Sequence, residues 1–261
     1  MKVTLLSKTE EPAKVVAAAA KLCYSDSDAA SLMENLTDEN IEKFVNKLQL
    51  LGHESPFEHV SFTFGIDGIS RACSHQLVRH RIASYSQQSQ RYVDMSDFKY
   101  VIPPSIENNT IGKDVFRDCM ETITDTYNVL LDLLTTAKCA ELYGDDHIYC
   151  SEKEIEKAKK LVQEDARFVL PNACETNIVM TMNVRSLYNF FKLRCCNRAQ
   201  WEIRNVAMEM YKLVYATAPV LFEYCGPTCV TKHVCSEGMM TCGNPDKKQQ
   251  EFVNIKECLK C

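Results

Sequence analysis

Two long stretches of helical periodicity, residues 113–142 and 151–165, stand between two short segments that alternate like strands. In residues 60–66 and 175–183, apolar side chains occupy every second position, as they do in a half-buried strand. Long helices set between few strands, without a regular strand-helix alternation, favour an α+β domain. We expect a mixed or antiparallel sheet flanked by long helices.

Caps and periodicity predict the remaining elements. We expect strands at residues 2–7 and 98–102, and helices at 12–22, 37–52, 70–80, 186–194 and 198–217. Pro12 suits the first turn of a helix, while Thr37 and Gly52 suit its start and its end. Residues 82–92 are rich in Ser and Gln and lack aliphatic spacing, so they are expected to form a structured loop.

The last part of the chain has a different composition. Residues 223–261 hold six of the fourteen cysteines and three of the eight glycines, with little periodicity. We therefore expect a main domain over residues 1–222 and a Cys-rich C-terminal tail or small module over residues 223–261. Only Cys258-x-x-Cys261 has the spacing of half a metal site, so a reduced, loosely ordered tail is preferred over a zinc site. We predict no metal site and a tail dispensable for chemistry.

Charge and hydropathy exclude several classes of protein. The net charge is −5 and the pI is about 5.7, which argues against coating of nucleic acid or an anionic membrane. No segment approaches the roughly 18 apolar residues of a membrane span, and the first ten residues lack a signal-peptide core. We expect a cytoplasmic protein without nucleic-acid or membrane partners. The absence of G-x-G-x-x-G and P-loop patterns argues against those two nucleotide-binding turns.

Two windows contain no Asp or Glu, although the chain is acidic overall. Residues 68–93 carry four arginines, and residues 176–201 carry three arginines and one lysine. Arginine forks bind phosphates and heterocycle edges bidentately. A solvated basic face is the ordinary explanation, but Arg79, His80 and Arg81 are consecutive and cannot all lie on one helix face. An anionic ligand is therefore favoured, and a nucleotide-binding module without turnover is the alternative.

Several motifs together carry a family resemblance. Arg79-His80-Arg81 is followed after seven residues by Ser89, and Gly-His-Glu-Ser-Pro-Phe-Glu-His fills residues 52–59. Downstream, residues 183–194 contain Asn-Val-Arg-Ser-Leu and end in Leu-Arg, and Ala-Gln-Trp-Glu-Ile fills residues 199–203. In this order the motifs resemble those of flavin-dependent thymidylate synthases. The resemblance covers residues 1 to about 222 and supports the expected fold.

The resemblance implies a homotetramer that binds FAD and converts dUMP to dTMP, with methylenetetrahydrofolate as carbon donor and NADPH as reductant. Positions matching the family's FAD contacts are Ser55, Arg79, His80, Arg81, Gln87, Asn183, Val184, Arg185 and Asn189. Positions matching its dUMP contacts are Gln76, Leu77, Val78, Arg79, Gln87, Gln88, Ser89, Gln90, Arg91, Arg167 and Arg194. His53 matches a position near the flavin where folate and nicotinamide are thought to stack.

The chemistry is assigned to Arg194, which would stabilise negative charge on the pyrimidine ring and make C5 nucleophilic. Arg185 and Asn189 are one helical turn apart, and Arg194 is about 140° from Asn189, so two helix faces could serve two ligands. No Pro-Cys-His triplet is present, and Cys195 and Cys196 are interpreted as packing residues, so no cysteine nucleophile is expected. Ser86-Gln87 stands where family members often have Asn-Glu, and an amide cannot act as a carboxylate base.

Overall fold

The computed structural model describes residues 1–144 and 150–260 and divides the chain into two compact units. The first unit comprises Met1–Asp67, Gln76–Ser86 and Ile178–Cys261, and the second comprises Gly68–His75 and Gln87–Asn177. Strands β2 (Ser61–Ser70) and β4 (Glu175–Asn183) contribute residues to both units. Each unit is described separately below.

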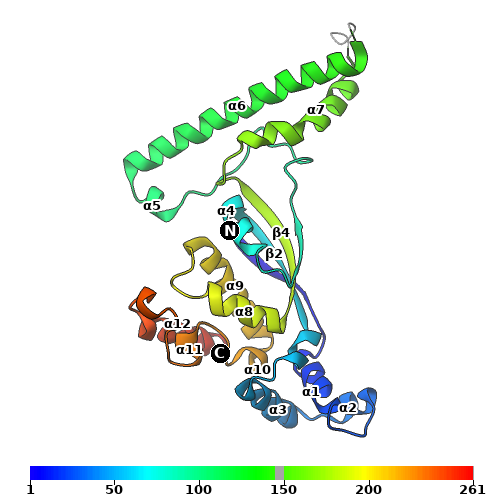
Figure 1. Cartoon of the computed structure of the whole chain (residues 1–261), viewed down its shortest axis with the longest axis vertical. Coiled ribbons are helices and arrows are strands. Elements are labelled where there is room, and N and C mark those ends of the chain that lie inside the picture. The colour runs from blue at the N-terminus through cyan, green and yellow to red at the C-terminus, as the bar shows by residue number, and fades with distance from the viewer. Residues whose placement is uncertain (145–149, 261) are drawn as a thin grey trace. The chain divides into compact units, whose positions relative to one another are not determined.

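The first unit is mainly helical (Figure 1). Its elements are β1 (Lys2–Lys8), α1 (Pro12–Leu22), α2 (Ala29–Asn35), α3 (Asp38–Leu51), η1 (Ser55–His59), α8 (Val184–Arg194), α9 (Trp201–Thr217), α10 (Pro219–Phe222), α11 (Thr228–Thr231), η4 (Gly238–Met240) and α12 (Pro245–Lys260). Helix α9 contacts α8, α10 and α12 as well as β1. The expected helices 12–22 and 37–52 are confirmed, with Thr37 and Gly52 at the two caps of α3.

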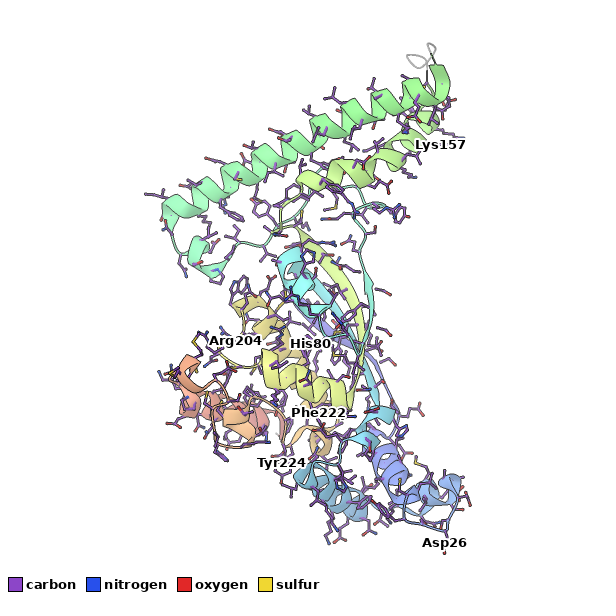
Figure 2. The ribbon with its side chains drawn as sticks, viewed as in Figure 1. Asp26, His80, Lys157, Arg204, Phe222 and Tyr224 are labelled. Carbon is purple, nitrogen blue, oxygen red and sulfur yellow. The ribbon has the colours of Figure 1, made fainter. Side chains whose placement is uncertain are left out.

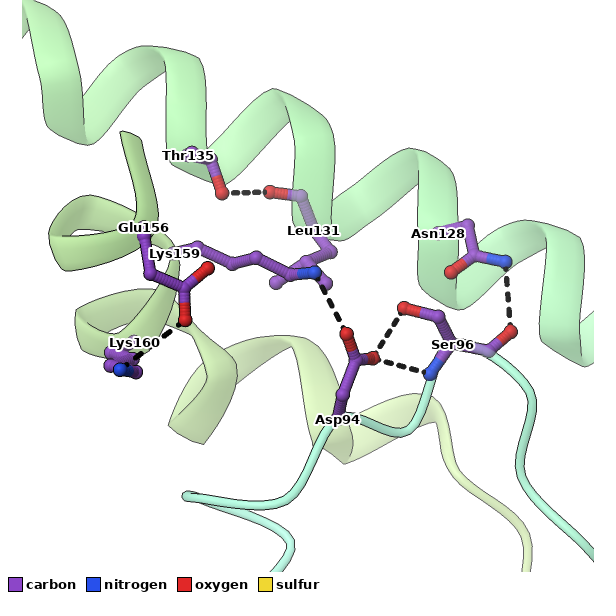
Figure 3. A network of polar contacts seen from close by, with 8 residues as sticks. All are labelled: Asp94, Ser96, Asn128, Leu131, Thr135, Glu156, Lys159 and Lys160. Carbon is purple, nitrogen blue, oxygen red and sulfur yellow. Dashed lines mark hydrogen bonds and ion pairs between the residues drawn. The ribbon is translucent and has the colours of Figure 1, made fainter. Parts of the chain in front are cut away.

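The second unit is built on a helical hairpin. Its elements are α4 (Arg71–Leu77), α5 (Pro104–Glu107), α6 (Thr110–Tyr143), α7 (Glu152–Ala166) and η3 (Arg167–Val169). Helices α6 and α7 enclose a small core that includes Tyr127, Leu131 and Val162. Beside it, Asp94 accepts from Ser96 and from Lys159 of α7, and these contacts hold the pKa of the Asp94 carboxyl at about 2 (Figure 3).

The sheet has the strand order β1-β2-β4-β3, with β3 at Ser84–Gln87. Strands β1 and β2 pair antiparallel, with Lys2 opposite Asp67 and Lys8 opposite Phe62. Phe62, Phe64 and Ile66 are fully buried, as their alternation predicts. The α+β class with an antiparallel sheet is confirmed.

Aromatic side chains fill the core of the first unit. Phe191 makes edge contacts with Tyr211 and Phe222, at ring-centroid distances of 5.7 and 6.2 Å. The ring of Phe252 from α12 lies 4.7 Å from that of Tyr211 and is 1% exposed. The loosely ordered tail expected from composition is therefore wrong. Residues 245–260 form a helix whose Phe252 completes this core.

Three further local expectations need correction. Residues 82–92 contain the short strand β3, which polar side chains concealed from the pattern. Residues 98–102 form only an isolated bridge between Tyr100 and Cys174. The helix expected over residues 70–80 begins at Arg71 and ends at Leu77. The carbonyl oxygens of Leu77 and His80 both accept from the hydroxyl of Tyr85, so the chain turns after Leu77.

Candidate functional site

A cavity of about 780 Å³ lies within the first unit, between three segments of the chain. Glu54 and Glu58 come from the segment around η1, residues 79–82 from the turn after α4, and the other lining residues from Asn183 and α8. Its five cationic side chains, Arg79, Arg81, Arg185, Lys192 and Arg194, face two carboxylates. The cavity is therefore positively charged in an acidic protein and suits an anionic ligand.

The turn after α4 explains how three consecutive residues line one cavity. The hydroxyl of Tyr85 donates to the carbonyl oxygens of Leu77 and His80, at 2.9 and 2.8 Å. Burial raises the pKa of Tyr85 to about 12, so the hydroxyl keeps its proton. This bridge folds the chain back after Leu77. Arg79, His80 and Arg81 consequently leave the helix and all reach the cavity wall.

His80 and Arg194 form a direct pair in this wall. The Nε of Arg194 donates to Nε2 of His80 at 3.0 Å, so Nδ1 carries the proton of the neutral imidazole. The ring of His80 also makes an edge contact with Phe190, at a centroid distance of 4.9 Å. Burial and then the charge of Arg194 lower the pKa of His80 to about 4. The imidazole therefore stays neutral at physiological pH.

The start of α8, the helix that lies beside His80 in Figure 2, organises another wall of the cavity. Asn183 caps the helix by accepting from the backbone nitrogen of Ser186 at 2.8 Å. Arg185, in the first turn, pairs with Glu58 and lies 3.5 Å from Glu54. These contacts hold the pKa of the Arg185 guanidinium above its usual value. Asn189, one turn further along, lines the same cavity.

A second polar group lies within the second unit. The Nε2 of Gln87 donates to the hydroxyls of Ser74 and Thr176, at 3.1 and 3.2 Å. Oε1 of Gln88 accepts from Asn177 at 3.3 Å. The side-chain nitrogen of Gln90 is buried and has no hydrogen-bond partner. An unsatisfied buried donor of this kind marks a position where a ligand acceptor would be favourable.

Arg91 and Arg167 also lie in the second unit. Nη2 of Arg91 lies 2.6 Å from a carboxylate oxygen of Glu164, and its guanidinium lies over the ring of Tyr92. Arg167 donates through Nε to the backbone oxygen of Glu164 at 3.1 Å. The backbone nitrogen of Arg91 donates to the hydroxyl of Ser89 at 3.1 Å. Glu164 thus contacts both arginines, Arg91 through its carboxylate and Arg167 through its backbone oxygen.

The predicted site residues are distributed between the two units. The first unit holds His53, Ser55, Gln76, Leu77, Val78, Arg79, His80, Arg81, Asn183, Val184, Arg185, Asn189 and Arg194. The second unit holds Gln87, Gln88, Ser89, Gln90, Arg91 and Arg167. The side chains of Leu77 and Val184 are fully buried, so these two residues could meet a ligand only through their backbone. Arg185, Asn189 and Arg194 line one cavity although they occupy two faces of α8.

Sequence analysis missed the acidic partners of the arginines. Glu54 and Glu58 belong to the motif at residues 52–59, and they bind Arg185 across the cavity. Glu164 lies in a helix that carries no predicted site residue. Long side chains of opposite charge carry no sequence signal when they are this far apart. Tyr85, which shapes the turn, is a further residue whose role the sequence does not indicate.

Cys195 is confirmed as a packing residue. It is fully buried, and burial raises the pKa of its thiol well above the usual value. Within residues 1–144 and 150–260, no group of three or more His, Cys, Asp or Glu side chains is arranged to hold a metal ion. Cys261 of the predicted half-site lies outside the described residues, and Cys258 is exposed.

Comparison with known proteins identifies the family to which the chain belongs. The family model described as "Thymidylate synthase complementing protein" matches residues 4–220. A flavin-dependent thymidylate synthase of Clostridium tetani is 51% identical over 253 residues, 97% of each chain. The chain belongs to the family of flavin-dependent thymidylate synthases. It is therefore an enzyme.

Other members of the family agree with this assignment. A flavin-dependent thymidylate synthase of Geobacter sulfurreducens is 46% identical over 254 residues, covering 97% of this chain and 98% of that one. A crystal structure of the Helicobacter pylori flavin-dependent thymidylate synthase, complexed with FAD and dUMP, has a TM-score of 0.55 and 24% identity. It covers 87% of this chain and 100% of that one, and confirms the fold expected for the family. In the described part of this chain, no helix has the length and apolar character needed to cross a membrane.

Proposed function

We propose that this chain catalyses the reductive methylation of dUMP to dTMP. Methylenetetrahydrofolate is the carbon donor, FAD is the hydride carrier and NADPH is the reductant. The observation that carries the proposal is the cationic cavity in which Arg79, His80 and Arg81 meet Arg194. Because the chain belongs to the flavin-dependent thymidylate synthases, the presence of this cavity supports the proposed reaction. The FAD and dUMP complex of the Helicobacter pylori protein supports it as well.

The residues of the first unit fit FAD. The cofactor carries a pyrophosphate, and the cavity has an excess of cationic side chains and the size of a typical ligand pocket. It would be held by Ser55, Arg79, His80, Arg81, Asn183, Arg185 and Asn189, together with the backbone of Val184. The family resemblance also assigns Gln87 to FAD. When bound, the flavin supplies a hydride. The neutral His80 presents an N–H donor at Nδ1, and it holds Arg194 by accepting at Nε2.

The residues of the second unit fit dUMP. Arg91 would bind the phosphate together with Ser89, and Arg167 adds a second guanidinium, since charge-assisted pairs with phosphate are strong. The unpaired nitrogen of Gln90 provides a donor for a ring carbonyl or ribose oxygen. Gln87 and Gln88 complete the proposed set in this unit. The family resemblance also assigns Gln76, Leu77, Val78, Arg79 and Arg194 to dUMP.

Arg194 is the proposed catalytic residue. Methylation requires attack from C5 of the pyrimidine, and negative charge then develops on the ring. A preorganised guanidinium stabilises that charge more than it stabilises the ground state. Cys195 does not supply a nucleophile in this scheme, because its buried thiol does not ionise readily. Carbon transfer proceeds without a covalent link to an enzyme cysteine.

We assign residues 1–222 to the catalytic domain and residues 223–261 to a C-terminal module. His53 is exposed before η1 and is assigned to stacking of folate or nicotinamide. The assembly is a homotetramer located in the cytoplasm, and its partners are these small molecules without nucleic acid or membrane.

The test uses the purified full chain. We expect the visible absorbance of bound FAD, its loss on addition of NADPH, and dTMP formation only when dUMP and methylenetetrahydrofolate are both present. A matched reaction without dUMP should still oxidise NADPH. A colourless protein that binds dUMP without forming dTMP would replace this function with a nucleotide-binding module.

A further inference from the structure

Another cationic pocket of the first unit adjoins the cavity described above. It measures about 280 Å³ and is lined by the end of α8, the turn that follows it, and part of residues 227–237. Lys192, Leu193 and Arg194 line both this pocket and the larger cavity. The two spaces therefore share a wall at the end of α8. The opposite wall of the pocket comes from the C-terminal module, beyond the residues that the family model matches.

The pocket carries an excess of positive charge. Its lining includes three cationic side chains, Lys192, Arg194 and Arg198, and the carboxylate of Glu237, so the formal net charge is +2. Lys192 and Arg194 stand in the last turn of α8, where a cation also interacts favourably with the helix dipole. Arg198 lies beyond the helix, so the dipole does not explain its position.

The turn that carries Arg198 is fixed by hydrogen bonds. Nη1 of Arg204 donates to the backbone oxygens of Asn197 and Ala199, at 2.9 and 3.3 Å. The backbone nitrogen of Ala199 donates to the carbonyl oxygen of Cys196 at 2.9 Å. The side chain of Arg198 is exposed and makes no ion pair with any residue that the structure describes. A guanidinium held on a fixed turn without a carboxylate partner is preorganised for an anionic ligand.

Ser236 adds a neutral donor to the pocket. The hydroxyl of Thr228 donates to Oγ of Ser236 at 3.0 Å, and the backbone nitrogen of Ser236 donates to Oγ1 of Thr228 at 3.2 Å. Both residues line the pocket. Because Ser236 accepts from Thr228, its own hydroxyl proton remains available for a ligand oxygen. A phosphate group has several acceptor oxygens and would use charged and hydroxyl donors together.

We propose that this pocket binds the 2′-phosphate of NADPH, and that Arg198 makes the enzyme select NADPH over NADH. The inference rests on the proposed function, in which NADPH reduces the flavin. The nicotinamide must then reach the flavin in the larger cavity, and the adjoining pocket suits the phosphate that distinguishes the two reductants. A phosphate monoester carries roughly two negative charges at neutral pH, which match the net charge of the pocket. Arginine also accommodates this phosphate in other NADP-binding sites.

The test compares the two reductants on the full chain purified with its flavin. Wild type should have a lower KM for NADPH than for NADH in flavin reduction. Arg198→Gln should raise the KM for NADPH by about tenfold or more, because a charge-assisted bond to phosphate is lost, and should change the KM for NADH little. Arg198→Lys should keep part of the preference, since it retains the charge. Arg117→Gln, which replaces an exposed arginine of α6, should leave both KM values unchanged.

Two further measurements support the comparison of KM values. Glu237→Gln removes the carboxylate of the pocket and should therefore lower the KM for NADPH without changing the KM for NADH. Calorimetric titration of the oxidised enzyme with NADP⁺ and with NAD⁺ measures binding without turnover. In this titration Arg198→Gln should weaken the binding of NADP⁺ by a similar factor and leave the binding of NAD⁺ unchanged.

Equal affinity of wild type and Arg198→Gln for NADP⁺ would overturn the proposal and leave the proposed reaction standing. So would an unchanged KM for NADPH with a higher KM for methylenetetrahydrofolate, which would assign the pocket to the carboxylates of the folate. Loss of bound FAD from the variant, with NADP⁺ affinity unchanged, would assign it to the phosphates of the cofactor. Failure of both reductants to reduce the wild-type flavin would instead contradict the proposed function, and the titrations would still decide whether Arg198 recognises the 2′-phosphate.

Discussion

The Nε of Arg194 donates a hydrogen bond to Nε2 of His80 at 3.0 Å, although the two residues are 114 positions apart. This bond requires a neutral imidazole, because a protonated ring has no acceptor. The charge of Arg194 and the burial of the ring both oppose protonation of His80. The same bond fixes the orientation of the guanidinium assigned to the pyrimidine. Protonation of His80 would therefore release Arg194.

The first prediction is a loss of stability in mild acid. The pKa of His80 is lowered from 6.5 to about 4 in the folded chain, so between these values the unfolded state binds more protons. The contribution of neutral His80 to the free energy of unfolding is fully present above pH 6.5, and it is lost as the pH falls toward 4. We expect wild type to lose more stability over this window than His80→Gln, which cannot titrate. Urea unfolding at a series of pH values measures the difference, and parallel pH profiles would contradict it.

The second prediction concerns Arg91, which pairs with Glu164 at 2.6 Å while both side chains are about half exposed. Arg91→Ala should weaken dUMP binding by about 1.5–3 kcal/mol, roughly 10- to 150-fold, because a charge-assisted bond to phosphate is lost. Glu164→Gln is the matched variant and should bind dUMP more tightly, since it removes the competing carboxylate. Calorimetric titration measures both affinities. Unchanged affinity in Arg91→Ala would remove this residue from the phosphate site.

Gln87 gives a third prediction, on stability. Its Nε2 donates to Ser74 and Thr176, while the hydroxyl of Ser74 donates to the backbone oxygen of Arg71 at 2.9 Å. A carboxylate at position 87 only accepts, so Ser74 would have to give up its bond to Arg71. We expect Gln87→Glu to lower the free energy of unfolding by about 1–3 kcal/mol.

The control for this variant is Gln88→Glu. Oε1 of Gln88 already accepts from Asn177, and a carboxylate would accept equally well. Denaturant unfolding of the two variants should therefore give a loss for position 87 and little change for position 88. Equal losses would show that the hydroxyl arrangement around Gln87 does not determine its effect.

Much of the fold could be predicted because the periodicity was strong and the caps were present. Thr37 and Gly52 bound α3 as expected, and the alternation of Phe62, Phe64 and Ile66 identified β2. Strand β3 could not be predicted, because its residues are polar and its extended conformation depends on pairing with β4. Local sequence carries no record of such pairing.

In the site, too, local patterns could be predicted from the sequence, whereas contacts between distant residues could not. The run from Arg79 to Arg81 was detectable because acidic residues are absent around it. Its geometry depends on Tyr85, whose hydroxyl caps two carbonyl oxygens, and a single tyrosine in a polar stretch gives no sign of that role. The contact between Glu58 and Arg185 joins residues 127 positions apart, and only the fold brings them together.

The fourth prediction concerns the stability that the C-terminal segment provides, whereas the expectation from sequence was that this segment is dispensable for chemistry. Phe252 is 1% exposed and packs on Tyr211, and a Cβ added at Gly226 would lie 2.8 Å from its ring. Phe252→Ala should lower the free energy of unfolding by about 3–5 kcal/mol, as for other buried aromatic residues. Val253→Ala, at a neighbouring and 44% exposed position, should change it little. Thermal unfolding compares the two, and a chain ended after Tyr224 should be destabilised at least as much as Phe252→Ala.

The last prediction tests the role of Arg194. An interaction that strengthens as charge develops on the pyrimidine lowers the barrier more than it tightens binding. Arg194→Ala should reduce dTMP formation by on the order of 100-fold or more, while the protein still binds FAD and is still reduced by NADPH. Arg194→Lys should recover little, because a point charge cannot address N3 and the neighbouring carbonyl together.

The comparison variant for Arg194 is Cys195→Ala, which removes the thiol next to it along the chain. Cys195 is fully buried and its raised pKa disfavours the thiolate, so the variant should form dTMP at a nearly normal rate once folded. Single-turnover dTMP yield from pre-reduced enzyme measures both changes without the flavin-reduction step. If Arg194→Ala kept its yield, or if Cys195→Ala lost its yield with fold and flavin intact, thiol catalysis would replace charge stabilisation as the mechanism.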